Sequence, residues 1–231
     1  VYKRQMYKGR KNHEDSSNKR CILVLSLLLF SLPVFAEGDP IKGKEFYITC
    51  AACHGQQGEG LQVTNSPRLA GLLEWYLISQ LKHFRAGSRG DNSKDTYGAQ
   101  MALMAKTLPN EKAILDVAAY IATFKAGRSA RTENSGDPAR GKSSFKGCMK
   151  CHGKNGEGNE APEVIKYRSS YGPRLSGQHD WYLIRQIRNY RDGIRGANRD
   201  DKATRYMLAD FRALQIDRDI FDLVAYIGTL E

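Results

Sequence analysis

Two five-residue stretches share one spacing: residues 50–54 read Cys-Ala-Ala-Cys-His, and residues 148–152 read Cys-Met-Lys-Cys-His. The pattern Cys-x-x-Cys-His is typical of the attachment site of a c-type haem. There the two thiols add across the haem vinyl groups, and the adjacent imidazole binds the iron. The sequence therefore predicts two covalently bound haem c groups. The residues expected to hold them are Cys50, Cys53 and His54 in the first copy and Cys148, Cys151 and His152 in the second.

The two motifs belong to a longer internal repeat. Residues 39–44 match residues 137–142, and the cysteines of the two motifs follow at the same offset of 98. Beyond the motif, Pro-Arg-Leu-Ala-Gly at 67–71 corresponds to Pro-Arg-Leu-Ser-Gly at 173–177 with an offset of 106, so the second half carries eight extra residues. The chain therefore consists of two copies of one domain.

The repeat places the domain boundaries, and its apolar periodicity predicts the fold class. We expect residues 37–126 to form the first domain and residues 137–231 the second, with the Ser-, Arg- and Asn-rich stretch 127–136 as the linker. Near the end of each copy, apolar residues recur at the spacing of one helix face, and no alternating strand pattern is evident. The predicted fold is all-α, with each small helical domain formed around its haem.

Earlier helices in each copy are predicted from their ends. The expected segments are short helices at 43–49 and 141–146 and longer ones at 72–86 and 178–192, the longer pair ended by Gly87 and Gly193. Asn110 and Asp217 are expected to cap the last helix of each copy through their side-chain oxygens.

Residues 1–36 have the features of a secretory signal segment. A basic stretch precedes an apolar run at 22–32, and Val-Phe-Ala at 34–36 forms a small-residue cleavage site. An uncleaved membrane anchor is the alternative, but a span needs about 20 apolar residues and this run is interrupted at Pro33. We therefore expect the mature chain to begin at Glu37 in the periplasm.

The charge of the chain argues against nucleic acid as a partner. Residues 1–36 hold seven Lys or Arg and two Asp or Glu, so they supply +5 of the formal net charge of +11 and leave +6 on the remainder. That remainder has no concentrated polybasic run of the kind that binds nucleic acid. Its charges indicate a solvated surface, with electrostatic steering toward an acidic partner as the alternative interpretation.

The sixth ligand of each iron decides what the haem does. A methionine there gives a raised potential suited to electron transfer, whereas an open position permits chemistry on a small molecule. The first copy offers Met101 and Met104. The repeat distinguishes them, because Met207 aligns with Met101, and Asp210 aligns with Met104. We predict Met101 and Met207 as axial ligands, although a methionine at helical spacing is often simply a core residue.

Three further pairs of residues are candidates for the surroundings of the haem. Each prolyl carbonyl would accept a hydrogen bond from the imidazole and fix its orientation, with an ordinary turn proline as the alternative. Each arginine would pair with haem propionates or face solvent, and each tryptophan would lie in the core or at a haem edge. These pairs are Pro67 and Pro173, Arg68 and Arg174, and Trp75 and Trp181.

Two other interpretations of the cysteines are weaker. A four-ligand zinc site would have to join motifs about a hundred residues apart, because each copy alone supplies three candidate ligands. A thioredoxin-like redox pair requires a βαβ context that the sequence lacks. The fifth cysteine, Cys21, lies in the signal segment, so no pair is left for a structural disulfide.

On these motifs, residues 39–230 resemble the dihaem cytochrome c4 family of class I c-type cytochromes and the related c553-type proteins. The resemblance implies two helical cytochrome domains that face each other, with axial pairs His54–Met101 and His152–Met207. Two features depart from the family. Leu103 stands where a proline is common after the ligand methionine, and the insertion near residues 160–167 enlarges the loop of the second haem.

The resemblance also implies a function. The protein is expected to be a periplasmic electron carrier and not an enzyme, passing single electrons from a quinol-oxidising complex or a dehydrogenase to a terminal oxidase or reductase, with peripheral membrane association as a further option. The alternatives are a dihaem peroxidase-like enzyme, which requires one copy to lack its methionine, and an electron-transfer subunit of a larger oxidoreductase complex.

Overall fold

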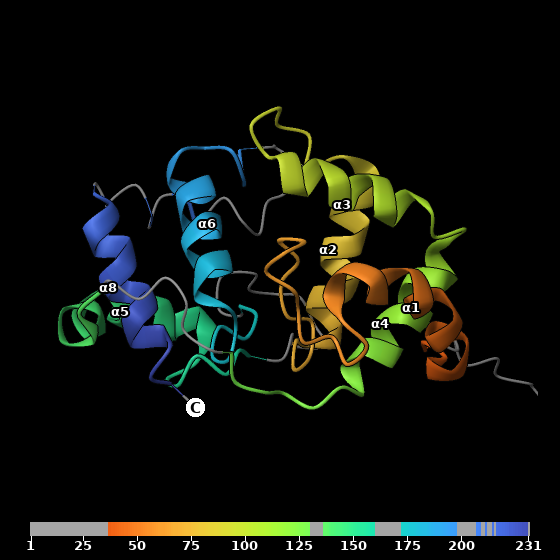
Figure 1. The fold of residues 1–231 in the computed structure, drawn as a ribbon, viewed down its shortest axis with the longest axis horizontal. Coiled ribbons are helices and arrows are strands. Elements are labelled where there is room, and N and C mark those ends of the chain that lie inside the picture. The colour runs from red at the N-terminus through yellow and green to blue at the C-terminus, as the bar shows by residue number, and fades with distance from the viewer. Residues whose placement is uncertain are drawn as a thin grey trace, which may run out of the picture. The chain divides into compact units, whose positions relative to one another are not determined.

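A computed structural model describes residues 37–129, 136–159, 172–197, 207–208, 211, 214 and 216–230 of the chain. These residues form seven helices (Figure 1). The described residues also contain one isolated β-bridge, between Leu61 and Ser66, but no strand. The predicted all-α fold is therefore confirmed. The helices are α1 (Pro40–His54), α2 (Glu74–Ala86), α3 (Thr96–Lys106), α4 (Glu111–Ala122), α5 (Pro138–His152), α6 (Asp180–Arg191) and α8 (Asp217–Ile227).

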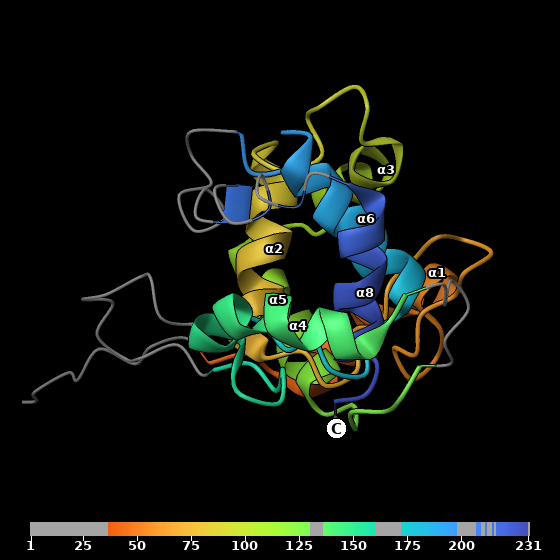
Figure 2. The same ribbon diagram turned by 90° about the vertical axis from the view of Figure 1, so that its left-hand side faces the viewer.

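The helices pack in the same way in the two halves of the chain. In the first half α1 packs against α4, and α2 contacts α3 and α4. In the second half α5 packs against α8, and α6 also contacts α8; Figures 1 and 2 show α5 lying across α8. Because α5 and α8 correspond to α1 and α4 in the repeat, the duplication seen in the sequence is a duplication of structure.

The helices that carry the Cys-x-x-Cys-His motifs are longer than expected. The carboxylate of Asp39 accepts hydrogen bonds from the first turn of α1, and that of Asp137 does so for α5. A proline follows each cap, with its ring pre-setting the helical φ. The helices then continue through the motifs to His54 and His152. The expected ends at residues 49 and 146 were wrong: both helices continue to the glycine that follows the histidine, and α5 does so through Gly147.

A glycine lets each motif helix cross the last helix of its domain at close range. A Cβ atom on Gly43 would lie 1.9 Å from the backbone oxygen of Asp116 in α4, and one on Gly141 would lie 1.8 Å from that of Asp222 in α8. The same aspartates accept hydrogen bonds from the helix starts, Asp39 N to Asp116 at 2.7 Å and Asp137 N to Asp222 at 2.6 Å. The position of each motif is therefore fixed by the last helix of its domain.

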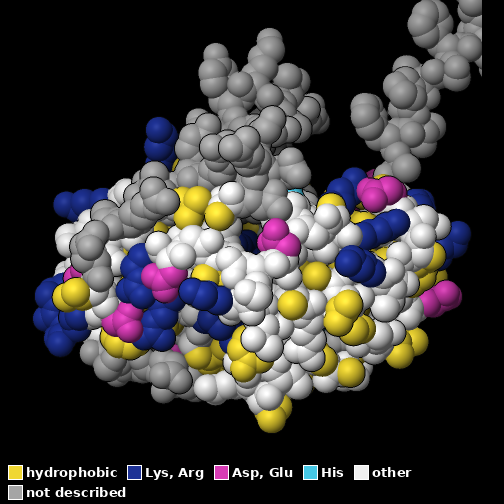
Figure 3. All heavy atoms as spheres, turned by 90° about the horizontal axis from the view of Figure 1, so that it is seen from above, with side chains coloured by type: hydrophobic (Ala, Val, Ile, Leu, Met, Phe, Trp, Pro, Cys, Tyr) yellow, Lys and Arg dark blue, Asp and Glu magenta, His cyan; other side chains and the backbone are white. Residues whose placement is uncertain are grey.

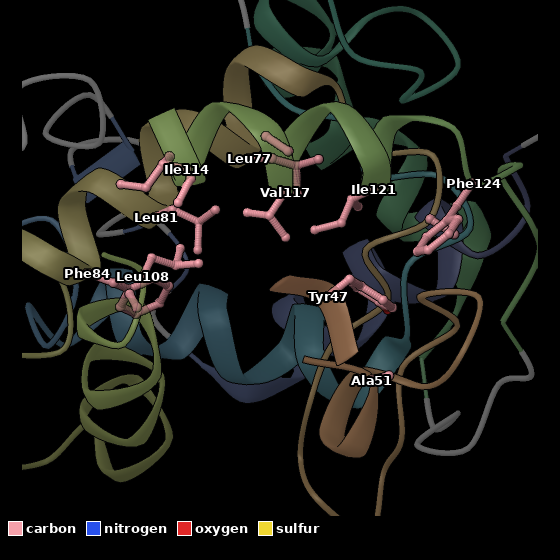
Figure 4. Packing of buried hydrophobic residues seen from close by; sticks show 14 of the residues in the cluster. Tyr47, Ala51, Leu77, Leu81, Phe84, Leu108, Ile114, Val117, Ile121 and Phe124 are labelled. Carbon is pink, nitrogen blue, oxygen red and sulfur yellow. The ribbon is translucent and has the colours of Figure 1, made fainter. Parts of the chain in front are cut away.

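Each half has its own apolar core, and that of the first half is drawn in Figure 4. The face of α4 predicted from periodicity is buried there, with Ile114 at 0% and Val117 at 1% exposed. The corresponding face of α8 is buried in the second core through Ile220 and Leu223. The two cores confirm that the apolar spacing in the last helix of each copy marks its inner face.

Other helix ends depart from expectation in part. Asn110 caps α4 as predicted, accepting from Ala113 N at 2.9 Å. Asp217 does not cap α8: it is the first helical residue, and its carboxylate is instead paired with Arg188 and Arg191 of α6 at 2.6 and 2.8 Å. The long helices begin at Glu74 and Asp180, two residues after the predicted starts.

Helix α3 was not anticipated from the sequence. Gly98 in its first turn weakens the helical signal, but this glycine fits a close contact, because a Cβ on Gly98 would lie 2.1 Å from a carboxylate oxygen of Asp95. The buried carboxylate of Asp95 caps the helix by accepting from Gly98 N at 3.0 Å. In consequence Met101 lies in a helix that packs on α2.

No helix within the described residues is long and apolar enough to cross a membrane. The predicted signal segment, residues 1–36, and most of the predicted linker lie outside them. On the face drawn in Figure 3, Lys and Arg side chains are interspersed with Asp and Glu and do not form one basic patch.

Candidate functional site

The four motif cysteines lie on the last turns of α1 and α5. Cys50 and Cys53 are three residues apart on α1, and Cys148 and Cys151 have the same spacing on α5, so each pair shares a helix face. All four are of intermediate exposure, and none of them is in a disulfide. The two thiols of each motif are therefore placed on one side of the helix that ends in the motif histidine.

Each motif histidine is held by a prolyl carbonyl, as predicted. His54 Nδ1 lies 2.9 Å from the carbonyl oxygen of Pro67, and His152 Nδ1 lies 2.7 Å from that of Pro173. A carbonyl oxygen can only accept, so Nδ1 carries the proton in both rings. The lone pair is left on Nε2, which is the atom available to a metal.

The surroundings keep both imidazoles neutral. His54 and His152 are 7% and 5% exposed. Burial lowers the pKa of each ring, and the hydrogen bond to the proline carbonyl opposes that shift only in part. A neutral imidazole is the form that binds a metal. The ring nitrogens are thus prepared for coordination at ordinary pH.

The second site contains a direct sign of a missing partner. His152 Nε2 is buried and has no hydrogen-bond partner among the described residues. A buried polar atom without a partner is costly, and an axial bond to haem iron would satisfy it. The donor set of this half, two thiols and a free imidazole nitrogen, fits a covalently attached haem.

The same loop geometry orients both histidines. Gly60 N donates to His54 O at 2.8 Å, and Gly158 N donates to His152 O at 2.8 Å. Both glycines have φ near +80°, which favours glycine. The eight-residue insertion falls after this turn, and residues 160–171 lie outside the described residues. Despite the insertion, Pro173 reaches His152 as Pro67 reaches His54.

The methionines differ in their burial. Met101 is partly buried against the first core together with Cys50, and Met207 is partly buried against the second core together with Cys148. Met104, by contrast, is 37% exposed and stands among the exposed hydrophobic residues. The structure therefore brings each repeat-selected methionine to the core that its own motif helix borders.

The remaining predicted residues lie toward the contact between the two halves. Arg68 Nε donates to Ser129 Oγ at 3.1 Å and its Nη2 to Arg128 O at 3.0 Å. The half-buried Trp75 donates from Nε1 to Asn159 O at 3.2 Å, across to the second half. Their pairing with propionates or a haem edge stays a prediction.

The corresponding residues of the second half are placed differently. Arg174 Nε donates to Ser176 O at 3.0 Å, close to its own backbone. Trp181 is 8% exposed, in line with its expected core position, and stacks on His179 with ring centroids 5.1 Å apart.

One group of residues at this contact was not found from the sequence. It joins α2 and α6 through paired arginines, glutamines and tyrosines: Arg89 and Arg195, Gln80 and Gln186, and Tyr76 and Tyr182. The signal was present, because each pair is separated by the repeat offset of 106.

Comparison with known proteins places the chain in a family. The family model described as cytochrome c matches residues 41–125 and again residues 138–231. The chain belongs to the cytochrome c family. Cytochrome c4 of Azotobacter vinelandii is 30% identical over 227 residues, covering 92% of this chain and 99% of the relative. The crystal structure of reduced recombinant cytochrome c4 from Pseudomonas stutzeri has a TM-score of 0.66 at 30% identity, covering 84% of this chain and 100% of that one.

A third relative has a more specific name. The thiosulfate dehydrogenase electron acceptor of Thiomonas intermedia (strain K12) is 31% identical over 160 residues, covering 65% of this chain and 66% of the relative. Together these matches confirm the resemblance to cytochrome c4 and the fold of two tandem cytochrome c domains. The chain is a cytochrome c4-like electron carrier that binds haem c and serves redox protein partners.

Proposed function

We propose that the protein carries two haem c groups and transfers single electrons between redox proteins of the periplasm. The supporting observation is the repeated site, in which each half holds a buried neutral imidazole, a pair of cysteines that form no disulfide, and a methionine on one core. Bound haem supplies the one-electron iron couple. In the first site Cys50 and Cys53 would form the thioethers, with His54 and Met101 as axial ligands. In the second these would be Cys148 and Cys151, with His152 and Met207.

The ligand set favours a carrier over an enzyme. A peroxidase-like reaction requires an iron with an open position. Met101 and Met207 both lie against their cores, where a thioether can close that position. The proline hydrogen bonds hold each imidazole in one orientation, which would keep these two ligands in place during one-electron transfer.

The proposal includes the domain limits and the location. The domains would be residues 37–126 and 137–231, joined by the linker 127–136 and preceded by a cleaved signal segment at 1–36. A secreted chain suits covalent haem attachment, which needs thiols that are not consumed in disulfides, and the motif cysteines form none. The mature protein would work in the periplasm, with peripheral membrane association as an added feature.

The partners are proposed by class. One relative is named as an electron acceptor of thiosulfate dehydrogenase, which supports a dehydrogenase as the donor; a quinol-oxidising complex is the other donor class. The acceptor would be a terminal oxidase or reductase. An electron-transfer subunit within a larger oxidoreductase is the second candidate, supported by the same relative.

The ligands are tested by the absorption band that arises from methionine-to-iron(III) charge transfer. We expect about two haems per chain, and Met101→Ala and Met207→Ala should each remove about half of the band's intensity. Met104→Ala is the matched control, because Met104 lies three residues along the same helix but is exposed, and it should leave the band unchanged. A wild type without the band, or a Met101→Ala or Met207→Ala variant that retains all of it, would contradict the assignment. Carbon monoxide binding to the reduced wild type would favour the enzyme.

A further inference from the structure

Two arginines are buried where the two halves of the chain meet. Arg89 follows the end of α2 and is 8% exposed; Arg195 follows the end of α6 and is 6% exposed. They are equivalent residues of the repeat, 106 positions apart. Burying a guanidinium is costly unless an anion or a full set of hydrogen bonds compensates it.

Arg89 is held by neutral groups from both halves. Its Nη1 donates to Gln80 Oε1 at 2.6 Å. Its Nη2 donates to the hydroxyl of Tyr182 at 3.2 Å and to Gln186 Oε1 at 3.3 Å. Tyr182 and Gln186 belong to α6 of the second half, whereas Gln80 belongs to α2 of the first, so the Arg89 guanidinium bridges the two halves.

Arg195 repeats the arrangement in the opposite direction. Its Nη1 donates to Gln186 Oε1 at 2.7 Å, and its Nη2 donates to Gln80 Oε1 at 3.1 Å and to Tyr76 OH at 3.3 Å. The two arginines therefore share the same two glutamine oxygens. The result is a reciprocal cluster with two positive charges and uncharged acceptors.

The hydrogen bonding of this cluster is incomplete. The Nε atoms of Arg89 and Arg195 are buried and have no hydrogen-bond partner within the described part of the chain. The positive potential also affects a neighbour: burial acts to raise the pKa of Tyr182, but Arg89, Arg195 and Arg185 together outweigh it and lower that pKa. The cluster thus has an excess of donors and of positive charge.

A cavity of about 230 Å³ adjoins the cluster. It is lined by the turns that follow α2 and α6, including both arginines. Among its described lining residues the only carboxylate is that of Asp91, which is exposed. A site that holds water needs only about 10–15 Å³ of such volume, so this space is ample for a small oxyanion.

We propose that Arg89 and Arg195 form an oxyanion site shared by the two cytochrome domains. Planar guanidinium groups bind carboxylate, phosphate and sulfate with paired hydrogen bonds. The oxyanion has two potential sources: the propionate of a haem, or a free inorganic anion such as phosphate. The propionate source rests on the proposed haem attachment, whereas the cationic cavity does not.

The site has a structural connection to the first haem domain. Gly90, next to Arg89, contacts Gly98 in the first turn of α3, the helix that carries Met101. An anion bound by both arginines would therefore join the methionine side of one domain to the end of α6 in the other. Loss of the anion would therefore weaken the contact between the two domains and leave the two guanidinium groups without a negatively charged partner.

The test compares holoprotein of the wild type with Arg89→Gln and Arg195→Gln, which remove the charge but keep an amide donor. Lys94→Gln is the control, because it removes an exposed positive charge from the same loop as Arg89. In one arm, the resonance Raman bending band of the haem propionates reports their hydrogen bonding. In the other, the unfolding midpoint is followed against added phosphate or sulfate, with chloride holding the ionic strength constant.

The two arms separate the sources. A propionate band shifted in both arginine variants but not in Lys94→Gln supports a propionate. A midpoint raised by phosphate or sulfate in the wild type, with apparent affinity about tenfold or more weaker in each variant, supports a free anion. If neither response occurs, the proposal is wrong. Arg89→Lys and Arg195→Lys replace any glutamine variant that fails to fold. A preparation without covalent haem would refute the proposed function, yet the anion titration would still test the cavity.

Discussion

Replacing Gly141 by alanine should separate α5 from α8 and destabilise the second domain. The new Cβ would lie 1.8 Å from Asp222 O and 2.4 Å from its carbonyl carbon, whereas ordinary contact begins near 3.4 Å. These are backbone atoms that cannot rotate away, so we take the upper end of the overpacking range, about 3 kcal/mol. Alanine gains about 1 kcal/mol of helix propensity over glycine, which leaves a net loss of about 2 kcal/mol.

The control for this substitution is on the same helix. Gly147 is exposed, and a Cβ there meets nothing within 4 Å. Gly147→Ala should therefore show the propensity term alone, a gain of about 1 kcal/mol. Thermal unfolding of the holoproteins is followed by far-ultraviolet circular dichroism. For a domain of this size it should place the midpoint of Gly141→Ala about 8–16 °C below that of the wild type and the midpoint of Gly147→Ala about 4–8 °C above it. Equal midpoints for the two variants, at equal haem content, would refute the close-crossing argument.

Two further predictions follow from differences and likenesses between the halves. The hydroxyl of Tyr47 donates to Gly55 O at 2.7 Å, in a buried position that Phe145 fills in the second half. Tyr47→Phe should therefore lower the free energy of urea unfolding by about 0.5–1.5 kcal/mol and leave the haem content unchanged. A variant that fails to fold would show that the aromatic ring alone does not suffice at this position. The hydrogen bond from Arg140 holds the pKa of Asp222 below its usual range, so the stabilisation by this carboxylate is complete above about pH 4, the unfolded value, and decreases as pH falls through the folded value. Unfolding free energies measured from pH 7 downward should fall less steeply for Asp222→Asn than for the wild type, and parallel curves would contradict this.

The repeat made the sites predictable from the sequence. Met101 was selected over Met104 by register alone, and the structure shows the selected residue against the core and the other exposed. The contact of Pro67 with His54 was one of two interpretations of this proline, with an ordinary turn as the alternative, and the family resemblance favoured it; the structure shows the contact. The roles of these residues toward haem are still predictions.

What the sequence did not reveal depends on contacts between distant segments. Asp217 is a residue type that often caps helices, but its carboxylate is paired with two arginines of α6. The sequence around Asp217 does not indicate these ion pairs with another helix. Helix α3 was missed because Gly98 lowers the local helix propensity, although a glycine is required there by the close approach of the Asp95 carboxylate that caps the helix. The arginine cluster joins residues more than ninety positions apart, so only the repeat offset hinted at it.

The hydrogen bonds that each half makes to the haem-motif loop of the other half differ, although the proposed ligand sets of the two halves are the same. The loop that follows His54 is held by the second half, where His179 Nε2 meets Glu59 O at 2.8 Å and Arg185 donates to Asn65 O at 2.8 Å. The equivalents of His179 and Arg185 in the first half are Leu73 and Ser79.

Neither leucine nor serine can reproduce these two contacts, because leucine has no polar atom and serine is too short to replace the reach of an arginine. The first half instead contacts the second loop through Trp75, whose Nε1 donates to Asn159 O at 3.2 Å. Hydrogen bonding and solvent access around a haem tune its potential without any change of ligand. Divergence of the repeat at these contact residues therefore gives the protein a means to separate two otherwise equivalent sites.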